Sequence, residues 1–145
     1  MRMDQTNVDE QRAARILIVE DEPMIALNIE DILVDAGFQI AGVAVKLDQA
    51  LALIEADAVD AAIVDANLAG VSASPAAVAL AARGLPFIMM SGYSKEQMQG
   101  EFPQAFFLSK PCRSDLLIAT LNSALRDKQG EMARDREVAK RVGSS

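Results

Sequence analysis

Four short apolar runs in this chain each lead to side chains that could take part in one reaction. These side chains are Asp65 after the run 61–64, Glu20 and Asp21 after the run 16–19, Ser91 after the run 87–90, and Lys110 after the run 106–108. Runs of this length between turn residues predict buried strands, although periodicity alone does not exclude helix. In open α/β sheets the C-terminal edge of the strands is where ligands bind. If the strands are parallel neighbours, three acids, a hydroxyl and an amine converge there.

Three carboxylates at adjacent strand ends would repel one another. At an effective dielectric constant near 20, one pair about 4 Å apart costs on the order of 4 kcal/mol. A divalent cation offsets this repulsion, and carboxylates, a backbone carbonyl and waters are the hard oxygen ligands that Mg²⁺ takes. Lys110 supplies a second positive charge on a flexible stem. We therefore expect a magnesium site that Lys110 borders.

A carboxylate held by Mg²⁺ and an ammonium can attack phosphorus, because both cations neutralise the oxygens of an incoming phosphoryl group. Nucleophilic aspartates of this kind form aspartyl phosphates, and the catalysis consists of positioning and electrostatics. The Ser91 hydroxyl at the end of the next strand can donate to the new phosphoryl oxygens. Asp65 is the candidate nucleophile.

The remaining chain alternates predicted strands with predicted helices. The strands cover 16–19, 38–45, 61–64, 86–91 and 104–109. The helices cover 24–36, 47–56, 75–83, a weak one at 93–100, and one from about 114, while 70–74 is a loop of small residues. Such alternation predicts an α/β domain with a parallel sheet and helices on both faces. Right-handed crossovers leave few topologies.

The composition excludes several classes of function. Of the 145 residues, 51% are hydrophobic but only 4% aromatic, so the core must be aliphatic. A net charge of −7 disfavours nucleic acid and anionic membranes as partners. The absence of histidine removes histidine base or metal chemistry, and the single cysteine, Cys112, is a bystander. With no transmembrane run and no signal-peptide core, we expect a cytoplasmic protein.

The acidic pair Glu20-Asp21, Asp65, Ser91 and Lys110-Pro111 occur in the order and spacing of a receiver domain. From residue 15 to 128 the chain resembles the receiver domain of two-component response regulators. The resemblance implies a flavodoxin-like (βα)5 doubly wound sheet of strand order 2-1-3-4-5. It implies phosphorylation of Asp65 by a histidine kinase or a histidine phosphotransfer protein, with Ser91 and Lys110 stabilising the phosphoryl group. It also implies Mg²⁺ held by Asp21, Asp65 and the backbone carbonyl of Asn67, with Glu20 acting through water.

Phe107, three residues before Lys110, occupies the position of the family's aromatic switch residue. The resemblance implies that Ser91 moves toward the phosphoryl group and that the ring of Phe107 turns into the space left behind. The surface of the fourth helix and fifth strand, 93–100 and 104–109, then changes. A downstream protein partner, or a second copy in a phosphorylation-dependent homodimer, would recognise that surface.

A narrower resemblance is to stand-alone receivers of a bacterial stress-response subgroup with a Pro-Phe-x-Phe-Ala-Thr-Gly-Tyr stretch. This chain keeps Pro86-Phe87 and Gly92-Tyr93 but departs at Met89, Met90 and Ser91. The segment 65–70 lacks the Met-Pro common in the family. With a flexible leader at 1–14 and a charged tail at 129–145, we expect a stand-alone receiver that signals by protein contact. The pattern leaves open whether the tail extends the last helix.

Three other functions compete with this interpretation. A degenerate receiver would bind partners without phosphorylation, although every required group is present. A phosphatase with an aspartyl-phosphate intermediate needs a second Asp two residues after the nucleophile, and Asn67 stands there. A flavin- or nucleotide-binding domain needs a phosphate-binding loop where Glu20-Asp21-Glu22 would repel phosphate. We therefore expect no enzyme beyond a slow autodephosphorylation.

Overall fold

Five parallel strands form a central sheet in the order β2-β1-β3-β6-β7. The computed structural model describes residues 14–56, 58–91, 105–110 and 112–126. The strands are β1 (Arg15–Val19), β2 (Gln39–Ala44), β3 (Ala61–Asp65), β6 (Phe87–Ser91) and β7 (Phe106–Ser109). The short strands β4 (Asn67–Leu68) and β5 (Val71–Ser72) pair only with each other. In chain order the sheet is therefore 2-1-3-4-5, which confirms the predicted flavodoxin-like topology.

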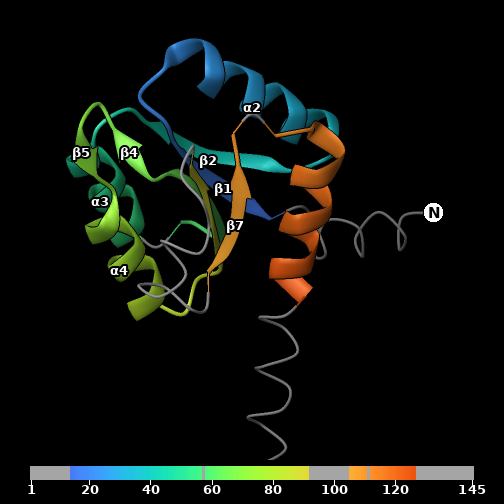
Figure 1. Ribbon diagram of the computed structural model, residues 1–145. Helices are drawn as coiled ribbons and strands as arrows, with labels where there is room; N and C mark the ends of the chain where they lie inside the picture. The colour runs from blue at the N-terminus through green and yellow to red at the C-terminus, as the bar shows by residue number, and fades with distance from the viewer. Residues whose placement is uncertain (1–13, 57, 92–104, 111, 127–145) are drawn as a thin grey trace, which may run out of the picture.

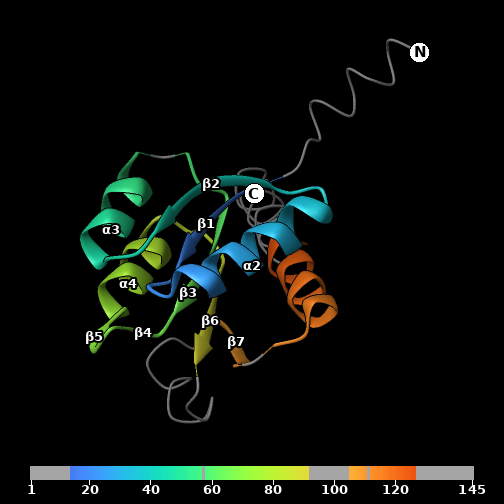
Figure 2. The ribbon, with the colours of Figure 1, turned by 90° about the horizontal axis from the view of Figure 1, so that it is seen from above.

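Helices cover both faces of the sheet and make a three-layered molecule (Figure 1). The helices α2 (Pro23–Asp35) and 114–126 lie on one face, and α3 (Leu47–Glu55) and α4 (Ser74–Ala82) lie on the other, as the view from above also shows (Figure 2). Helices α2, α3 and α4 begin and end within about two residues of their predicted bounds, and the last helix begins at residue 114, as predicted. The α/β class predicted from the alternation is confirmed.

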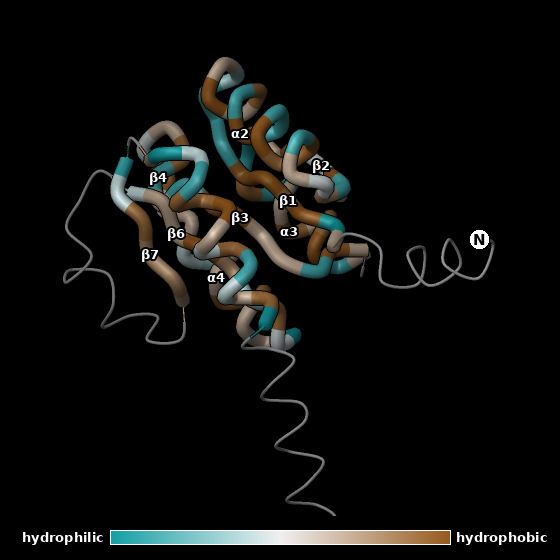
Figure 3. The backbone as a smooth tube through the Cα atoms, turned by 90° about the vertical axis from the view of Figure 1, so that its right-hand side faces the viewer, coloured by the Kyte–Doolittle hydropathy of each residue, from teal (hydrophilic) through white to brown (hydrophobic). Residues whose placement is uncertain are grey.

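The three central strands are hydrophobic along most of their length (Figure 3), and their polar residues Arg15, Asp65 and Ser91 stand at strand ends. Their side chains alternate between two aliphatic clusters, because successive residues of a strand point to opposite faces. Under α2 and helix 114–126 the strands contribute Ile16, Ile18, Ala61, Ile63, Ile88 and Met90. Under α3 and α4 they contribute Leu17, Val19, Ala62, Val64, Phe87 and Met89. Burial on both sides is typical of parallel sheets, and it fixes the ends of β1, β3 and β6 relative to one another.

Helix α2 starts directly after the acidic residues that follow β1. Pro23 is its first residue, where a missing N–H costs nothing. The helix ends at Asp35, and Gly37 just beyond it has a φ of 97°, which is readily adopted only by glycine. The N–H of Phe38 donates to the carbonyl of Leu33 at 2.9 Å, which completes a Schellman cap. Because α2 begins at Pro23 and β1 ends at Val19, only three residues join them, and this short segment keeps Glu20 and Asp21 at the edge of the sheet.

Residues 70–74, which are predicted to form a loop, belong in the structure to a hairpin and to the start of α4. Residues 67–72 form a hairpin in which Leu68 pairs with Val71 and Asn67 with Ser72, and α4 already begins at Ser74. Both central residues of its turn have positive φ, 52° at Ala69 and 88° at Gly70. This is the requirement of the tight type I′ turn that suits antiparallel hairpins. The small residues Ala69 and Gly70 close a hairpin whose first residue, Asn67, stands two positions after Asp65.

Several predictions fall outside the described residues. These are the leader up to residue 13, the weak helix at 93–100 and the charged tail from 129 onward. Within the described part, no helix is long and apolar enough to cross a bilayer.

Edge strand β2 carries a bulge opposite β1. Ile16 is paired with Ile40 but Leu17 with Gly42, so Ala41 has no partner in the ladder. A Cβ added at Gly42 would lie 2.9 Å from Cδ1 of Leu53 on α3. Glycine at this position therefore lets α3 approach the bulged strand.

We expect Gly42→Ala to destabilise the fold by about 1 kcal/mol, at the low end for overpacking, because the end of the Leu53 side chain can shift. The cost should vanish in a Leu53→Ala background, where the clashing methyl is gone. Urea unfolding of the four proteins of this double-mutant cycle measures it and cancels the effect of alanine on the unfolded chain. An equal cost in both backgrounds would exclude the clash as the cause.

Candidate functional site

The ends of four strands meet at one edge of the sheet. Val19 is in register with Val64, Asp65 with Met90, and Ser91 with Ser109. Because these strands are parallel, the residues at and just beyond their C-terminal ends are neighbours. The structure thus brings Glu20, Asp21, Asp65, Ser91 and Lys110 to the same edge, as the spacing along the chain predicts.

Glu20, Asp21 and Asp65 form one acidic cluster. One carboxylate oxygen of each lies within 4.8 Å of the other two. Glu20 and Asp65 are buried, with 2% and 7% of their surface exposed, and Asp21 is half-buried. Three convergent oxygens on a half-open edge fit a hard divalent cation with room for waters, which is the donor set that Mg²⁺ prefers. The roles of the individual ligands stay predictions.

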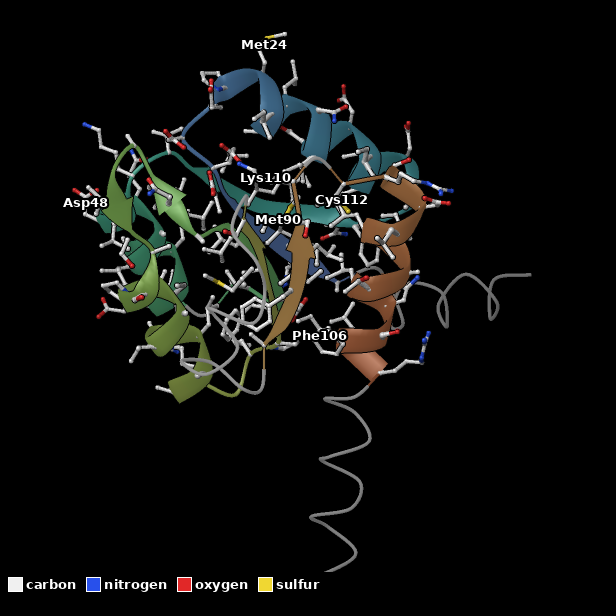
Figure 4. All side chains as sticks on the ribbon, viewed as in Figure 1. Met24, Asp48, Met90, Phe106, Lys110 and Cys112 are labelled. Atoms are coloured by element: carbon white, nitrogen blue, oxygen red, sulfur yellow. The ribbon has the colours of Figure 1, made fainter. Side chains whose placement is uncertain are left out.

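Lys110 links two of these acids. Its Nζ lies 3.0 Å from Oδ2 of Asp65 and 3.1 Å from Oε1 of Glu20. Figure 4 shows Lys110 at the end of β7, on the side of the sheet that α2 covers. Burial lowers the pKa of Lys110, but its hydrogen bonds and charge interactions with Asp65 and Glu20 outweigh this, so that its pKa lies above the ordinary value. Lys110 is therefore a permanently protonated, positively charged side chain within the cluster.

Glu20 is held from two sides. Its Oε2 accepts the N–H of Glu22 at 3.1 Å, and its own N–H donates to the carbonyl of Ala44 at 3.0 Å. Burial raises the pKa of Glu20, and the charge of Asp65 adds to this. The N–H of Glu22 and the ammonium of Lys110 lower it by less. Burial therefore has the largest influence on the Glu20 carboxyl, and the ammonium of Lys110 and the N–H of Glu22 favour its charged form.

The two oxygens of Asp65 have different partners. Oδ2 accepts from Lys110, and Oδ1 accepts the N–H of Asn67 at 3.2 Å. The first partner comes from a distant strand and the second from the hairpin that follows Asp65 directly. Both oxygens are therefore oriented before any ligand binds.

Ser91 and Phe107 lie on the same face of the sheet. Phe107 is in register with Met89, and Ser91 is two residues beyond Met89 on the same strand. Because every second residue of a strand shares a face, Ser91 and the ring of Phe107 both point toward the α3–α4 side. Phe107 packs partly buried against the cluster on that side, and Ser91 is buried. The structure places the two residues near each other, whereas their switching role stays a prediction.

A cavity of about 330 Å³ lies between α2 and helix 114–126, and Ile25, Ile29, Met90, Lys110, Cys112 and Leu117 line much of it. Burial, and to a lesser degree the charge of Asp115, raises the pKa of the Cys112 thiol. A raised pKa keeps the thiol protonated and unreactive. This agrees with the interpretation of Cys112 as a bystander.

Two features of the site are not foreseen from the sequence. The first is the direct ion pair between Glu20 and Lys110, since the resemblance implies a role for Glu20 through water at the metal. The second is the hairpin at 67–72. Its signal is the pair Ala69-Gly70 between Leu68 and Val71, which is weak because alanine disfavours positive φ.

Comparisons with known proteins agree with this arrangement. A family model described as the response regulator receiver domain matches residues 16–122. The phyllosphere-induced regulator PhyR of Methylorubrum extorquens is 33% identical over 127 residues, which cover 85% of this chain and 48% of that protein. The solution structure of the PhyR receiver domain from Erythrobacter litoralis is 28% identical with a TM-score of 0.71, over 80% of this chain and 92% of that one.

The crystal structure of the anti-anti-sigma factor PhyR from Bartonella quintana is 25% identical, with a TM-score of 0.76, over 93% of this chain and 56% of that one. The chain thus spans about half the length of the two longer relatives. Since the family model covers most of the chain and the acidic cluster with its lysine lies within it, this protein belongs to the response regulator receiver domain family.

Proposed function

We propose that Asp65 accepts a phosphoryl group from a histidine kinase or a histidine phosphotransfer protein in a reaction that needs Mg²⁺. The observation that carries this proposal is the setting of the Asp65 carboxylate, which lies 3.0 Å from the Nζ of Lys110 and beside the carboxylates of Glu20 and Asp21. Membership in the receiver family supports it. These 145 residues contain no histidine, so the donor histidine lies outside them.

The transfer balances without any further reactant. The bond between the donor imidazole nitrogen and phosphorus breaks, and a bond between phosphorus and a carboxylate oxygen of Asp65 forms. Bound Mg²⁺ would neutralise the phosphoryl oxygens. The carboxylates of Asp21 and Asp65 and the backbone carbonyl of Asn67 would hold the ion, with Glu20 acting through water. Receiver domains are signalling modules, and the only hydrolysis that we propose is slow autodephosphorylation.

Lys110 would follow the negative charge as it moves. In the structure its ammonium contacts both Glu20 and Asp65, and the cavity beside it gives its stem room to move. Once an oxygen of Asp65 is phosphorylated, that carboxylate loses its charge and the phosphoryl group carries about −1.5 to −2 instead. We propose that Lys110 then pairs with the phosphoryl group.

The signal would leave the site through β7. Ser91 and Phe107 share a face, so a shift of the Ser91 hydroxyl toward the phosphoryl group opens space on the side where the ring lies. The ring then turns inward and changes the outer surface of β7. A protein partner, or a second copy of this chain, would bind that surface. A relative from Bartonella quintana is named an anti-anti-sigma factor, but only its receiver-like half is comparable with this chain.

The aspartyl-phosphate phosphatase remains less supported than the phosphoacceptor. Such an enzyme needs an acid at position 67, whereas the Asn67 side-chain oxygen accepts the N–H of Gly70 at 2.7 Å. A carboxamide has no acidic proton to give to a leaving group.

Incubation with acetyl phosphate and Mg²⁺ should add one phosphoryl group to the intact protein, as measured by mass spectrometry. Asp65→Asn should abolish the added mass, because the carboxamide is no nucleophile, and EDTA should prevent it in the wild type. The matched control is Asp48→Asn at an exposed position on α3, which should be phosphorylated normally. Persistent phosphorylation of Asp65→Asn would exclude Asp65 as the acceptor.

In EDTA, Lys110→Met should lower the free energy of unfolding by about 2 kcal/mol, less than the roughly 3–5 kcal/mol of a fully buried pair because the lysine is partly exposed. Mg²⁺ should raise the urea midpoint of this variant more than that of the wild type, since the ion replaces the missing positive charge.

The control for this comparison is Arg113→Met, because the Arg113–Asp115 ion pair is exposed. Its midpoint should stay near the wild-type value in both buffers. A Lys110→Met variant as stable as the wild type in EDTA would contradict the compensating role of the lysine.

A further inference from the structure

The nucleophile of this receiver is tied to a hairpin. The N–H of Asn67 donates to Oδ1 of Asp65 at 3.2 Å, and Asn67 is the first residue of β4. Any change in the direction of β4 therefore moves the donor that orients this carboxylate. The orientation of the Asp65 carboxylate therefore depends on the closure of the hairpin.

The hydrogen-bond pattern of the hairpin turns the backbone of Asn67 toward the site. The N–H of Ala73 donates to the carbonyl of Ala66 at 3.1 Å, which is one of the two bonds of a hydrogen-bonded pair, while the N–H of Ala66 donates to the carbonyl of Met90 at 2.9 Å. Bonded and non-bonded pairs alternate in an antiparallel ladder, which makes the next pair, Asn67 with Ser72, a non-bonded one. The N–H and the carbonyl of Asn67 thus both point away from Ser72. Since the N–H meets Asp65, the carbonyl is on the side of the acidic cluster.

The turn that closes this hairpin is not intrinsically favourable. Ala69 has a φ of 52°, a conformation that alanine disfavours. The side chain of Asn67 offsets this, because its Oδ1 accepts the N–H of Gly70 at 2.7 Å across the turn. Leu68 of β4 is buried in the core, whereas Asn67, Ala69 and Gly70 are exposed, so packing holds the strand more than the turn. The hydrogen bond from Gly70 to the Asn67 side chain therefore adds to closure at the turn itself.

We propose that the Asn67 side chain is a positioning residue for the phosphoacceptor. By closing the turn at Gly70 it holds the Asn67 backbone so that its N–H orients Asp65 and its carbonyl faces the cation site. The side chain acts through the hairpin rather than on the metal or the phosphoryl group. This inference rests on the proposed function for the cation, whereas the closure of the hairpin can be tested without it.

Three variants separate this role from a direct one. Asn67→Ala removes the hydrogen bond to Gly70. Asn67→Asp keeps an oxygen that can accept it. Asn67→Ala combined with Ala69→Gly loses the hydrogen bond but also removes the conformational cost at φ 52°, at an exposed residue outside the acidic cluster. Ile54→Val, buried in the core under α3 and α4, is the control for a comparably small loss of stability.

Two NMR measurements serve as readouts. The first is hydrogen exchange of the Ala73 amide, which reports closure of the hairpin without any ligand. The second is titration with MgCl₂, followed at the backbone amide of residue 67. In Asn67→Ala we expect exchange to be faster, and Mg²⁺ binding weaker, by about two- to tenfold, the value of one net hydrogen bond. The second substitution at Ala69 should restore both, Asn67→Asp should keep the Ala73 amide protected, and Ile54→Val should change neither.

Unchanged exchange of Ala73 in Asn67→Ala would overturn the inference. So would a double variant in which exchange recovers but Mg²⁺ affinity does not, because the side chain would then act directly at the site. A wild-type protein that does not bind Mg²⁺ would overturn the proposed function together with the positioning role. That result is visible in the first titration, before any variant is made.

Discussion

The compensation of three carboxylates by one ammonium is the interaction on which this receiver depends. Two of the acids, Glu20 and Asp65, are almost fully buried, and both contact the Nζ of Lys110. Buried charges are retained only where they are paired and hydrogen-bonded. Burial is the main cause of the raised pKa of Glu20, and the N–H of Glu22 and the ammonium of Lys110 act against it. The convergence of three carboxylate oxygens beside one lysine is the feature that fits a cation.

The sheet holds the ends of four strands in register, and this register positions the residues of the site. An aliphatic core covers both faces of the central strands, and their polar side chains lie at the strand ends, where Arg15 pairs with Asp60 at the start of β1 and the acids lie at the C-terminal edge. The distances between the acids therefore depend on how the buried parts of these strands pack. A small displacement of β3 against β1 would separate Asp65 from Glu20, and the close packing of both layers opposes such a displacement.

The alternation of strands and helices and the convergence of the acids follow from the sequence, because five apolar runs alternate with helical patterns and parallel pairing brings the polar ends of the strands together. The strand order follows from the resemblance to receiver domains, since the alternation alone leaves several topologies open. The hairpin at 67–72 does not follow, since each of its strands has two residues and alanine stands where asparagine or glycine would signal the turn. The partner of Glu20 also does not follow, because the choice between a lysine and a metal-bound water depends on rotamers that the sequence does not encode. The bulge at Gly42 depends on how closely α3 approaches β2.

The two oxygens of Asp65 divide the site into a local and a distant half. Oδ1 is held by the backbone of the adjacent hairpin, and Oδ2 by a lysine that follows β7. The hairpin bond joins residues two positions apart and fixes the carboxylate relative to its own strand. The lysine bond joins residues 45 positions apart and couples the carboxylate to the strand that carries Phe107. A new charge on Asp65 can therefore leave the first bond in place while it changes the second. That asymmetry would direct the consequence of phosphorylation toward β7 rather than toward α4.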